Sequence, residues 1–164
     1  MTIATVADLI EHNEGRRHVC YRDTLGKLSN GVGHCLDTKP LPQTIIDALA
    51  AASISDPRSA MPWPDEIVTA LRDIDIADAR RECVDIFGDA FEGFGDARQA
   101  CLTDMAFELG EHGLRAFSHM IAAIAAGDWE TAAAEALSSQ WASQVPARAK
   151  ADASMLRSGE WPTS

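Results

Sequence analysis

Hydrophobic residues recur at three- and four-residue spacing along most of the chain, which predicts a predominantly helical protein. The first stripe predicts a helix from Thr2 to about His12, with the Thr2 hydroxyl as its N-cap. Its apolar positions are Ile3, Val6, Leu9 and Ile10. Later stripes predict helices over about 43–52, 65–87, 98–109, 114–126, 129–137, 139–143 and from Pro146 onward.

The pattern changes between residues 19 and 36, where glycines at 26, 31 and 33 interrupt any helical spacing. Glycine favours tight turns and strand edges, so this segment predicts a small β-region with hairpin turns. The result is an α+β, predominantly helical fold. On the long helix over 65–87, the acidic residues are expected on a solvated face; they are Asp73, Asp75, Asp78 and Glu82.

Composition sets the class of protein. With 164 residues, 46% of them hydrophobic, the chain can bury one substantial core or two small lobes. No apolar run approaches the roughly 20 residues of a membrane span, and the N-terminus lacks the pattern of a secretory leader. We therefore expect a soluble monomer, made in the cytoplasm, that does not insert into membranes.

The formal charge of −11, from 25 acidic and 14 basic residues, disfavours binding to nucleic acid or anionic surfaces. The cysteines are widely spaced and are expected to be reduced; they are Cys20, Cys35, Cys83 and Cys101. His18 and His34 lie near two of them, but the spacing of a structural zinc site is missing. We expect neither a metal nor a cofactor.

Two carboxylates, Glu14 and Asp23, flank the turn into the glycine-rich segment, nine positions apart. Inverting glycosidases hold such a pair about 6.5–9.5 Å apart, one carboxylic acid protonating the leaving oxygen and one carboxylate activating water. Nine residues of extended chain easily span that gap. Scattered surface carboxylates of an acidic protein are the alternative interpretation.

The whole segment resembles the phage-type lysozymes, the muramidases with which T-even-like phages open bacterial walls. The shared motifs are Glu14-Gly15, Tyr21-Arg22-Asp23-Thr24, Gly26 and Gly31-Val32-Gly33-His34. The family usually has threonine where this chain has Ser29, which keeps the hydroxyl but loses the methyl group that stiffens χ1. The likeness recurs over 105–117 and 141–161 and is weak over 37–95.

The resemblance implies a two-lobed fold: an N-terminal lobe with a small β-sheet over 1–64, a connecting helix over 65–87 and a helical C-terminal lobe over 88–164. It implies that Glu14 is the general acid and that Asp23 and Ser29 orient the attacking water. Arg148 would pair with Glu14 and support the site.

Four further residues are implied to bind substrate: Gly33 through its backbone, His34, and Phe107 and Glu108 on the far wall of a saccharide cleft. His34 is expected to buttress the carboxylates, although a pKa near neutrality keeps a proton-shuttle role open. Phe107 fits a place in the core as well as contact with the sugar.

The implied activity is glycoside hydrolysis of peptidoglycan at the β-1,4 bond between N-acetylmuramic acid and N-acetylglucosamine. The enzyme would reach the periplasmic wall from the host cytoplasm after membrane permeabilisation, or be carried on a virion. Because the chain is acidic, moderate salt would help activity by screening repulsion from an anionic wall. Two alternatives stay open: a non-catalytic binding module of the same fold, and a lytic transglycosylase, which typically relies on a single glutamate.

Overall fold

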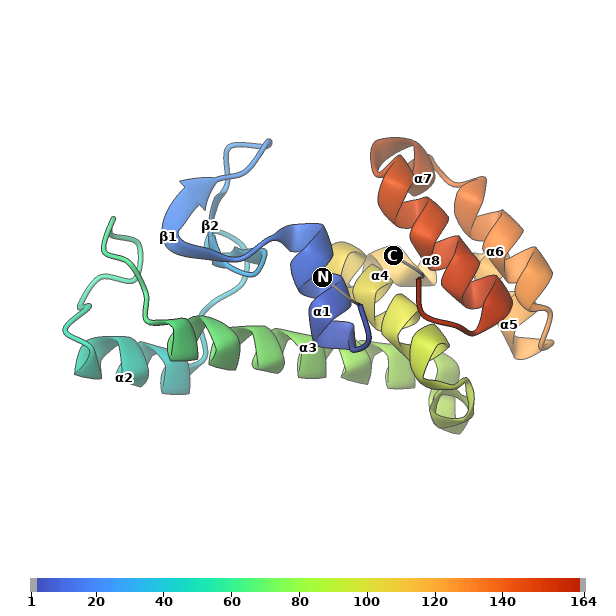
Figure 1. Cartoon of the computed structure of the whole chain (residues 1–164), viewed down its shortest axis with the longest axis horizontal. Helices are drawn as coiled ribbons and strands as arrows, with labels where there is room; N and C mark the ends of the chain where they lie inside the picture. Colours follow the sequence, from blue (N-terminus) through green and yellow to red (C-terminus); the bar gives the residue numbers. More distant parts are fainter. Residues whose placement is uncertain (1–2, 163–164) are drawn as a thin grey trace. The chain divides into compact units, whose positions relative to one another are not determined.

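The computed structural model describes residues 3–162 and divides the chain into two compact units (Figure 1). The sheet unit comprises Ile10–Asp75, and the helical unit comprises the chain up to Leu9 and from Ile76 onward. The predicted α+β, predominantly helical fold is confirmed. Among the described residues, no helix is long and apolar enough to cross a membrane.

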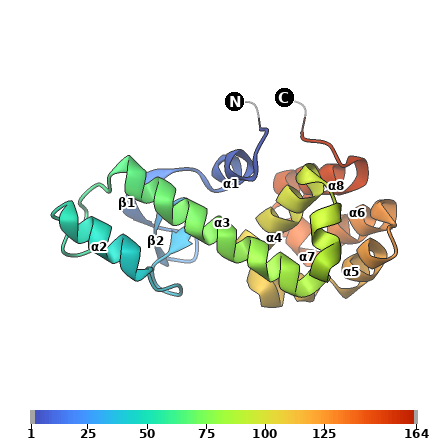
Figure 2. The same ribbon diagram turned by 90° about the horizontal axis from the view of Figure 1, so that it is seen from below.

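A three-stranded antiparallel sheet with the order β1-β2-β3 characterises the sheet unit, and Figure 2 shows its hairpin together with α2. The strands are β1 (Arg17–Arg22), β2 (Leu28–Gly31) and β3 (His34–Cys35), and α2 spans Gln43–Ala51. Buried apolar side chains of this unit include Ile10, Val32, Ile45, Leu49, Trp63, Val68 and Leu71.

Two helices contribute residues to both units. Helix α1 (Val6–Glu14) places its residues from Ile10 on in the sheet unit, and α3 (Asp65–Phe87) does so up to Asp75. The predicted start of the first helix at Thr2 is wrong, and Thr2 itself lies outside the described residues. The helix begins later because the Thr5 hydroxyl caps it, accepting the Asp8 N–H at 3.1 Å.

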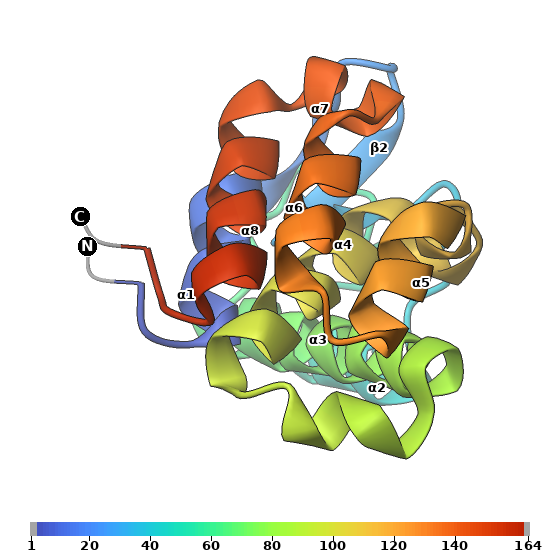
Figure 3. The same ribbon diagram turned by 90° about the vertical axis from the view of Figure 1, so that its right-hand side faces the viewer.

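Besides its parts of α1 and α3, the helical unit contains a 3₁₀ helix η1 (Gly88–Gly93) followed by five α-helices. These are α4 (Asp96–Arg115), α5 (Ser118–Ala125), α6 (Trp129–Leu137), α7 (Gln140–Gln144) and α8 (Pro146–Ser158). Helix α6 packs along α8 and beside α5 (Figure 3). Its buried face is made of Ala132, Ala133 and Ala136, small residues that allow close approach of the helices.

Local capping residues define two helix starts in this unit. Asp128 caps α6 by accepting the Thr131 N–H at 3.0 Å, and Pro146 opens α8. The predicted helix start at 114 is wrong, because α4 continues to Arg115 beyond a break at Gly110, whose backbone is non-helical at φ 69° and ψ 169°.

Candidate active site

Glu14 is the last residue of α1, half-buried, with its side chain against the backbone of Gly33. A Cβ placed on Gly33 would lie 2.9 Å from the Glu14 Oε2 atom, closer than real Cβ contacts. Gly33 also has φ +69°, a left-handed conformation that L side chains rarely adopt. The backbone conformation favours glycine, and a larger residue here would displace the Glu14 carboxyl, so the loop between β2 and β3 defines one wall around it.

Tyr21 on β1 links the two predicted catalytic carboxylates. Burial raises the pKa of its phenol, and the negative charges of Glu14 and, more weakly, Asp23 raise it further. The Arg17 guanidinium, 5.5 Å from the centre of the Tyr21 ring, acts in the opposite direction. Glu14 and Asp23 therefore both lie close enough to the Tyr21 phenol for their charges to act on it.

Asp23 is fixed by the tight turn that follows β1. Its Oδ1 accepts the backbone N–H groups of Leu25 and Lys27, each at 2.9 Å. The backbone closes the same turn, since the Asp23 N–H donates to the Lys27 carbonyl at 2.9 Å. Within residues 3–162, the other oxygen, Oδ2, accepts no hydrogen bond, so an oriented carboxylate keeps one oxygen available for water.

Ser29 lies on the central strand, 3% exposed, with Tyr21 opposite it on β1 and Cys35 opposite it on β3. Nothing in the sequence indicated that Cys35 would lie beside Ser29. Burial would raise the pKa of its thiol, but hydrogen bonds from the Thr38 side chain, from two backbone N–H groups and from the Ser29 hydroxyl together lower it. Only the strand register, which sequence did not provide, identifies this neighbour of Ser29.

His34 is held from both ring nitrogens. Its Nδ1 lies 2.8 Å from the Asp75 carboxylate and its Nε2 lies 3.2 Å from the Lys39 carbonyl oxygen, while the Lys39 ammonium pairs with the same carboxylate at 2.6 Å. The His34 side chain is 0% exposed, which favours the supporting role over direct contact with sugar. The expectation that Asp75 lies on a solvated face is wrong, because it is 5% exposed as the partner of His34.

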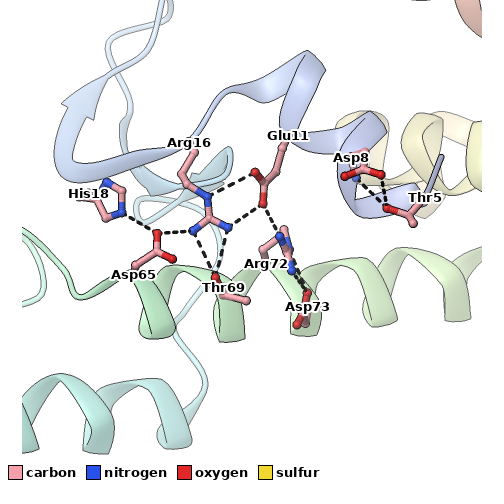
Figure 4. A network of polar contacts seen from close by, with 9 residues as sticks. All are labelled: Thr5, Asp8, Glu11, Arg16, His18, Asp65, Thr69, Arg72 and Asp73. Carbon is pink, nitrogen blue, oxygen red and sulfur yellow. Dashed lines mark hydrogen bonds and ion pairs between the residues drawn. The ribbon is translucent and has the colours of Figure 1, made fainter. Parts of the chain in front are cut away.

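A polar network ties the end of α1 and the start of β1 to the first turns of α3 (Figure 4). The Arg16 guanidinium binds Glu11 at 2.7 Å and Asp65 at 2.9 Å, and Arg72 pairs with Glu11 as well. The hydrogen bond from Arg16 is the main reason that the pKa of Glu11 is lowered, with burial opposing it. The network fixes the helix that ends at Glu14.

The remaining predicted site residues belong to the helical unit. Phe107 is half-buried and packs against the core. Glu108 accepts the Trp141 indole N–H at 2.9 Å, and its carboxylate lies 3.2 Å from Arg148. Within this unit Arg148 binds Asp104, a partner the sequence analysis missed, through Nε and Nη2 at 2.8 and 2.9 Å. The pairing of Arg148 with Glu14 stays a prediction.

All four cysteines are free thiols. The described part of the chain holds no group of three or more histidine, cysteine or carboxylate side chains arranged to bind a metal ion.

Comparison with known proteins supports the resemblance seen in the motifs. No family model matches the chain. It is 29% identical over 150 residues to the pre-baseplate central spike protein Gp5 of Enterobacteria phage T4, a match that covers 88% of this chain and 26% of Gp5. It is 21% and 22% identical over 165 residues to the probable T4-type lysozymes 1 and 2 of Dictyostelium discoideum, covering 96% of each chain. The resemblance to the phage-type lysozymes is thereby confirmed.

Proposed function

We propose that this chain, whose relatives over nearly its full length are named T4-type lysozymes, is a peptidoglycan hydrolase. The bond cleaved would be the β-1,4 linkage between N-acetylmuramic acid and N-acetylglucosamine. One observation carries the proposal: Glu14 is held against the Gly33 backbone, and its charge and that of Asp23 both act on Tyr21, the residue directly opposite Ser29 in the sheet.

In the proposed reaction, the protonated Glu14 carboxyl donates its proton to the glycosidic oxygen as the bond to the anomeric carbon breaks. Asp23 and the Ser29 hydroxyl orient a water molecule on the opposite face of the sugar. The water oxygen bonds to the anomeric carbon and its proton passes to Asp23. The turn that fixes Asp23 Oδ1 supports this role, because a preoriented carboxylate needs little reorganisation in the transition state.

The other residues would support binding and positioning. Gly33 lets the backbone approach the sugar, Phe107 and Glu108 would contact the glycan, and Arg148 would support the acid. His34 acts indirectly, since its pairing with Asp75 fixes the loop that carries Gly33. No cofactor is required by this chemistry.

Delivery of the enzyme has two candidate routes. The relationship to a phage spike protein favours an enzyme carried on the virion, and the alternative is an enzyme released from the host cytoplasm after membrane permeabilisation. Purified virions probed with an antibody against this chain would separate the two, since only the first route predicts a stoichiometric virion band.

The decisive test is lysis of chloroform-permeabilised Gram-negative cells, followed by analysis of the released ends. We expect Glu14→Gln to abolish lysis with the fold intact, because an amide cannot donate the required proton. Glu66→Gln, at an exposed glutamate of the same unit, is the matched control and should be fully active. A folded Glu14→Gln protein with normal turnover would refute the proposal.

The same assay separates hydrolysis from lytic transglycosylation. A hydrolase releases reducing N-acetylmuramic acid ends and should lose activity in Asp23→Ala. A fully active Asp23→Ala variant that releases anhydro ends would instead establish the transglycosylase. Tight wall binding without released ends from the wild type would establish a non-catalytic module.

A further inference from the structure

Asp152 places a carboxyl group in the dry core of the helical unit. The residue is 0% exposed, and no group within the described chain donates a hydrogen bond to either of its carboxylate oxygens. An ionised carboxylate is strongly disfavoured in such surroundings unless a cation or several donors compensate it. The position therefore needs an explanation that ordinary ion pairing does not give.

Among the described side chains, Arg148 is the cation that acts on Asp152, and its guanidinium is already paired with another carboxylate. Arg148 lies one turn earlier on α8, on the same helix face, and its guanidinium forms a two-point pair with the buried carboxylate of Asp104 on α4. It also donates to the Asp104 carbonyl at 3.2 Å and lies 3.2 Å from Glu108. Three carboxyl groups thus surround a single guanidinium, which one of them already neutralises.

Asp152 and Asp104 face each other across the contact between α4 and α8. The contacts bring them together, because Arg148, one turn before Asp152, binds Asp104, and Cys101, one turn before Asp104, binds the Asp152 backbone. After burial, the negative charge of Asp104 is the largest influence raising the pKa of Asp152. Arg148 opposes the shift, and Glu108 adds to it. Two carboxyl groups can share a hydrogen bond only when one of them carries the proton.

Within residues 3–162, Arg148 is the cation that acts on Asp152, and the buried residues of the other helices packed on α8 are uncharged. The buried residues of α6 are alanines, and those of α7 are Trp141 and Ala142; both helices pack on α8. On α4, the Cys101 thiol donates to the Asp152 backbone carbonyl at 3.2 Å and therefore not to the Asp152 carboxyl. Burial raises the pKa of the Cys101 thiol well above its usual range, so this thiol stays neutral.

We propose that Asp104 and Asp152 share one proton, and that Asp152, as the neutral acid of this pair, is a positioning residue for Arg148. The O–H of Asp152 donates to Asp104, which leaves a single negative charge opposite the guanidinium. Arg148 is then held in one orientation beside Glu108. The link from Arg148 to turnover rests on the proposed function, whereas the shared proton does not.

The pair has a pH dependence of defined sign. The folded-state pKa of Asp152 is raised, so its contribution to stability is complete below the pKa of an unfolded aspartate and is lost as the pH rises through the folded-state pKa. Loss of the proton leaves two adjacent anions in the core, and because both then compete for the guanidinium, Arg148 leaves its orientation beside Glu108. In the pH profile of lysis, activity should then fall about tenfold per pH unit on the alkaline side, the slope expected for the loss of one proton.

A titration of the carboxyl carbons by NMR tests the shared proton directly, on the full chain and without substrate. The Asp152 signal is assigned by its absence from Asp152→Asn. We expect it to report a protonated carboxyl at a pH at which the exposed N-cap Asp128, whose pKa is lowered by its hydrogen bonds to Thr131, is already ionised. An Asp152 signal that titrates together with exposed aspartates overturns the shared proton.

The pH profile of lysis tests the positioning role. Asp152→Asn keeps a donor toward Asp104 but cannot ionise, so it should lack the alkaline limb, whereas the matched control Asp128→Asn should keep it. If Asp152→Asn fails to fold, Asp152→Val serves in its place, and its thermal stability should lack the fall that the wild type shows between the unfolded-state and folded-state pKa values of Asp152. A protonated Asp152 combined with an unchanged limb in Asp152→Asn overturns the positioning role alone. An inactive wild type with a protonated Asp152 overturns the proposed function and not the acid pair.

Discussion

Replacement of Gly33 by alanine tests the geometry around Glu14 most directly. The left-handed backbone at φ +69° costs an alanine about 1–2 kcal/mol. The new Cβ would also lie 2.9 Å from Oε2 and 3.1 Å from Cδ and Cγ of Glu14. Since carbon contacts are optimal at about 3.5–4.0 Å, the Glu14 side chain must move by roughly 0.5–1 Å. A displacement of that size at a catalytic group reduces the rate by about 10²-fold.

Gly31→Ala, at the end of the preceding strand β2, provides the matched control. Its φ of +66° imposes the same backbone cost, but its Cβ would meet only Leu71 Cδ2 at an ordinary 3.8 Å. Thermal unfolding should show similar losses for both variants, about 2–8 °C for a chain of this size. Lysis of permeabilised cells should show a large rate loss for Gly33→Ala alone. Equal rates in the two variants would refute the inference that Gly33 positions the general acid.

Further predictions concern the groups around this site and the acid pair. Ser29→Ala should lose about 10²-fold in lysis rate while Ser29→Thr keeps or raises it, and equal rates for Ser29→Ala and wild type would make the hydroxyl merely structural. Cys35, whose pKa is lowered while burial raises the pKa of the other three thiols, should be alkylated first by iodoacetamide, with activity lost in step with one modified thiol by mass spectrometry. Asp75→Asn weakens the buried hydrogen bond with His34 and should lower the free energy of unfolding in urea by about 1.5–3 kcal/mol. Between the unfolded-state and folded-state pKa values of Asp152, the stability of the wild type relative to Asp152→Asn should fall by about 1.4 kcal/mol per pH unit.

Local signals in the sequence were enough for most of the helices and for the hairpin region, but not for the starts predicted at Thr2 and at 114. The long helix over 65–87 has the predicted bounds, and the caps at Asp128 and Pro146 lie where their residue types indicated. Each of these signals acts within a few residues, through side-chain spacing, a capping hydrogen bond or a fixed φ. The glycines over 26–33 likewise predicted the hairpin region, because their backbone conformations are a property of the chain itself.

Only the tertiary structure decided which polar side chains are buried and which groups they contact. Asp75 follows the same helical pattern as its acidic neighbours, yet it alone pairs with His34, because the sheet packs on that turn of α3. Cys35 became a neighbour of Ser29 through strand register, and Asp152 met Asp104 through the packing of α8 on α4. A periodic pattern tells which residues share a face of one element. It does not tell which element will cover that face, and in the low-dielectric interior that partner determines the charge, the hydrogen bonds and hence the chemistry of each group.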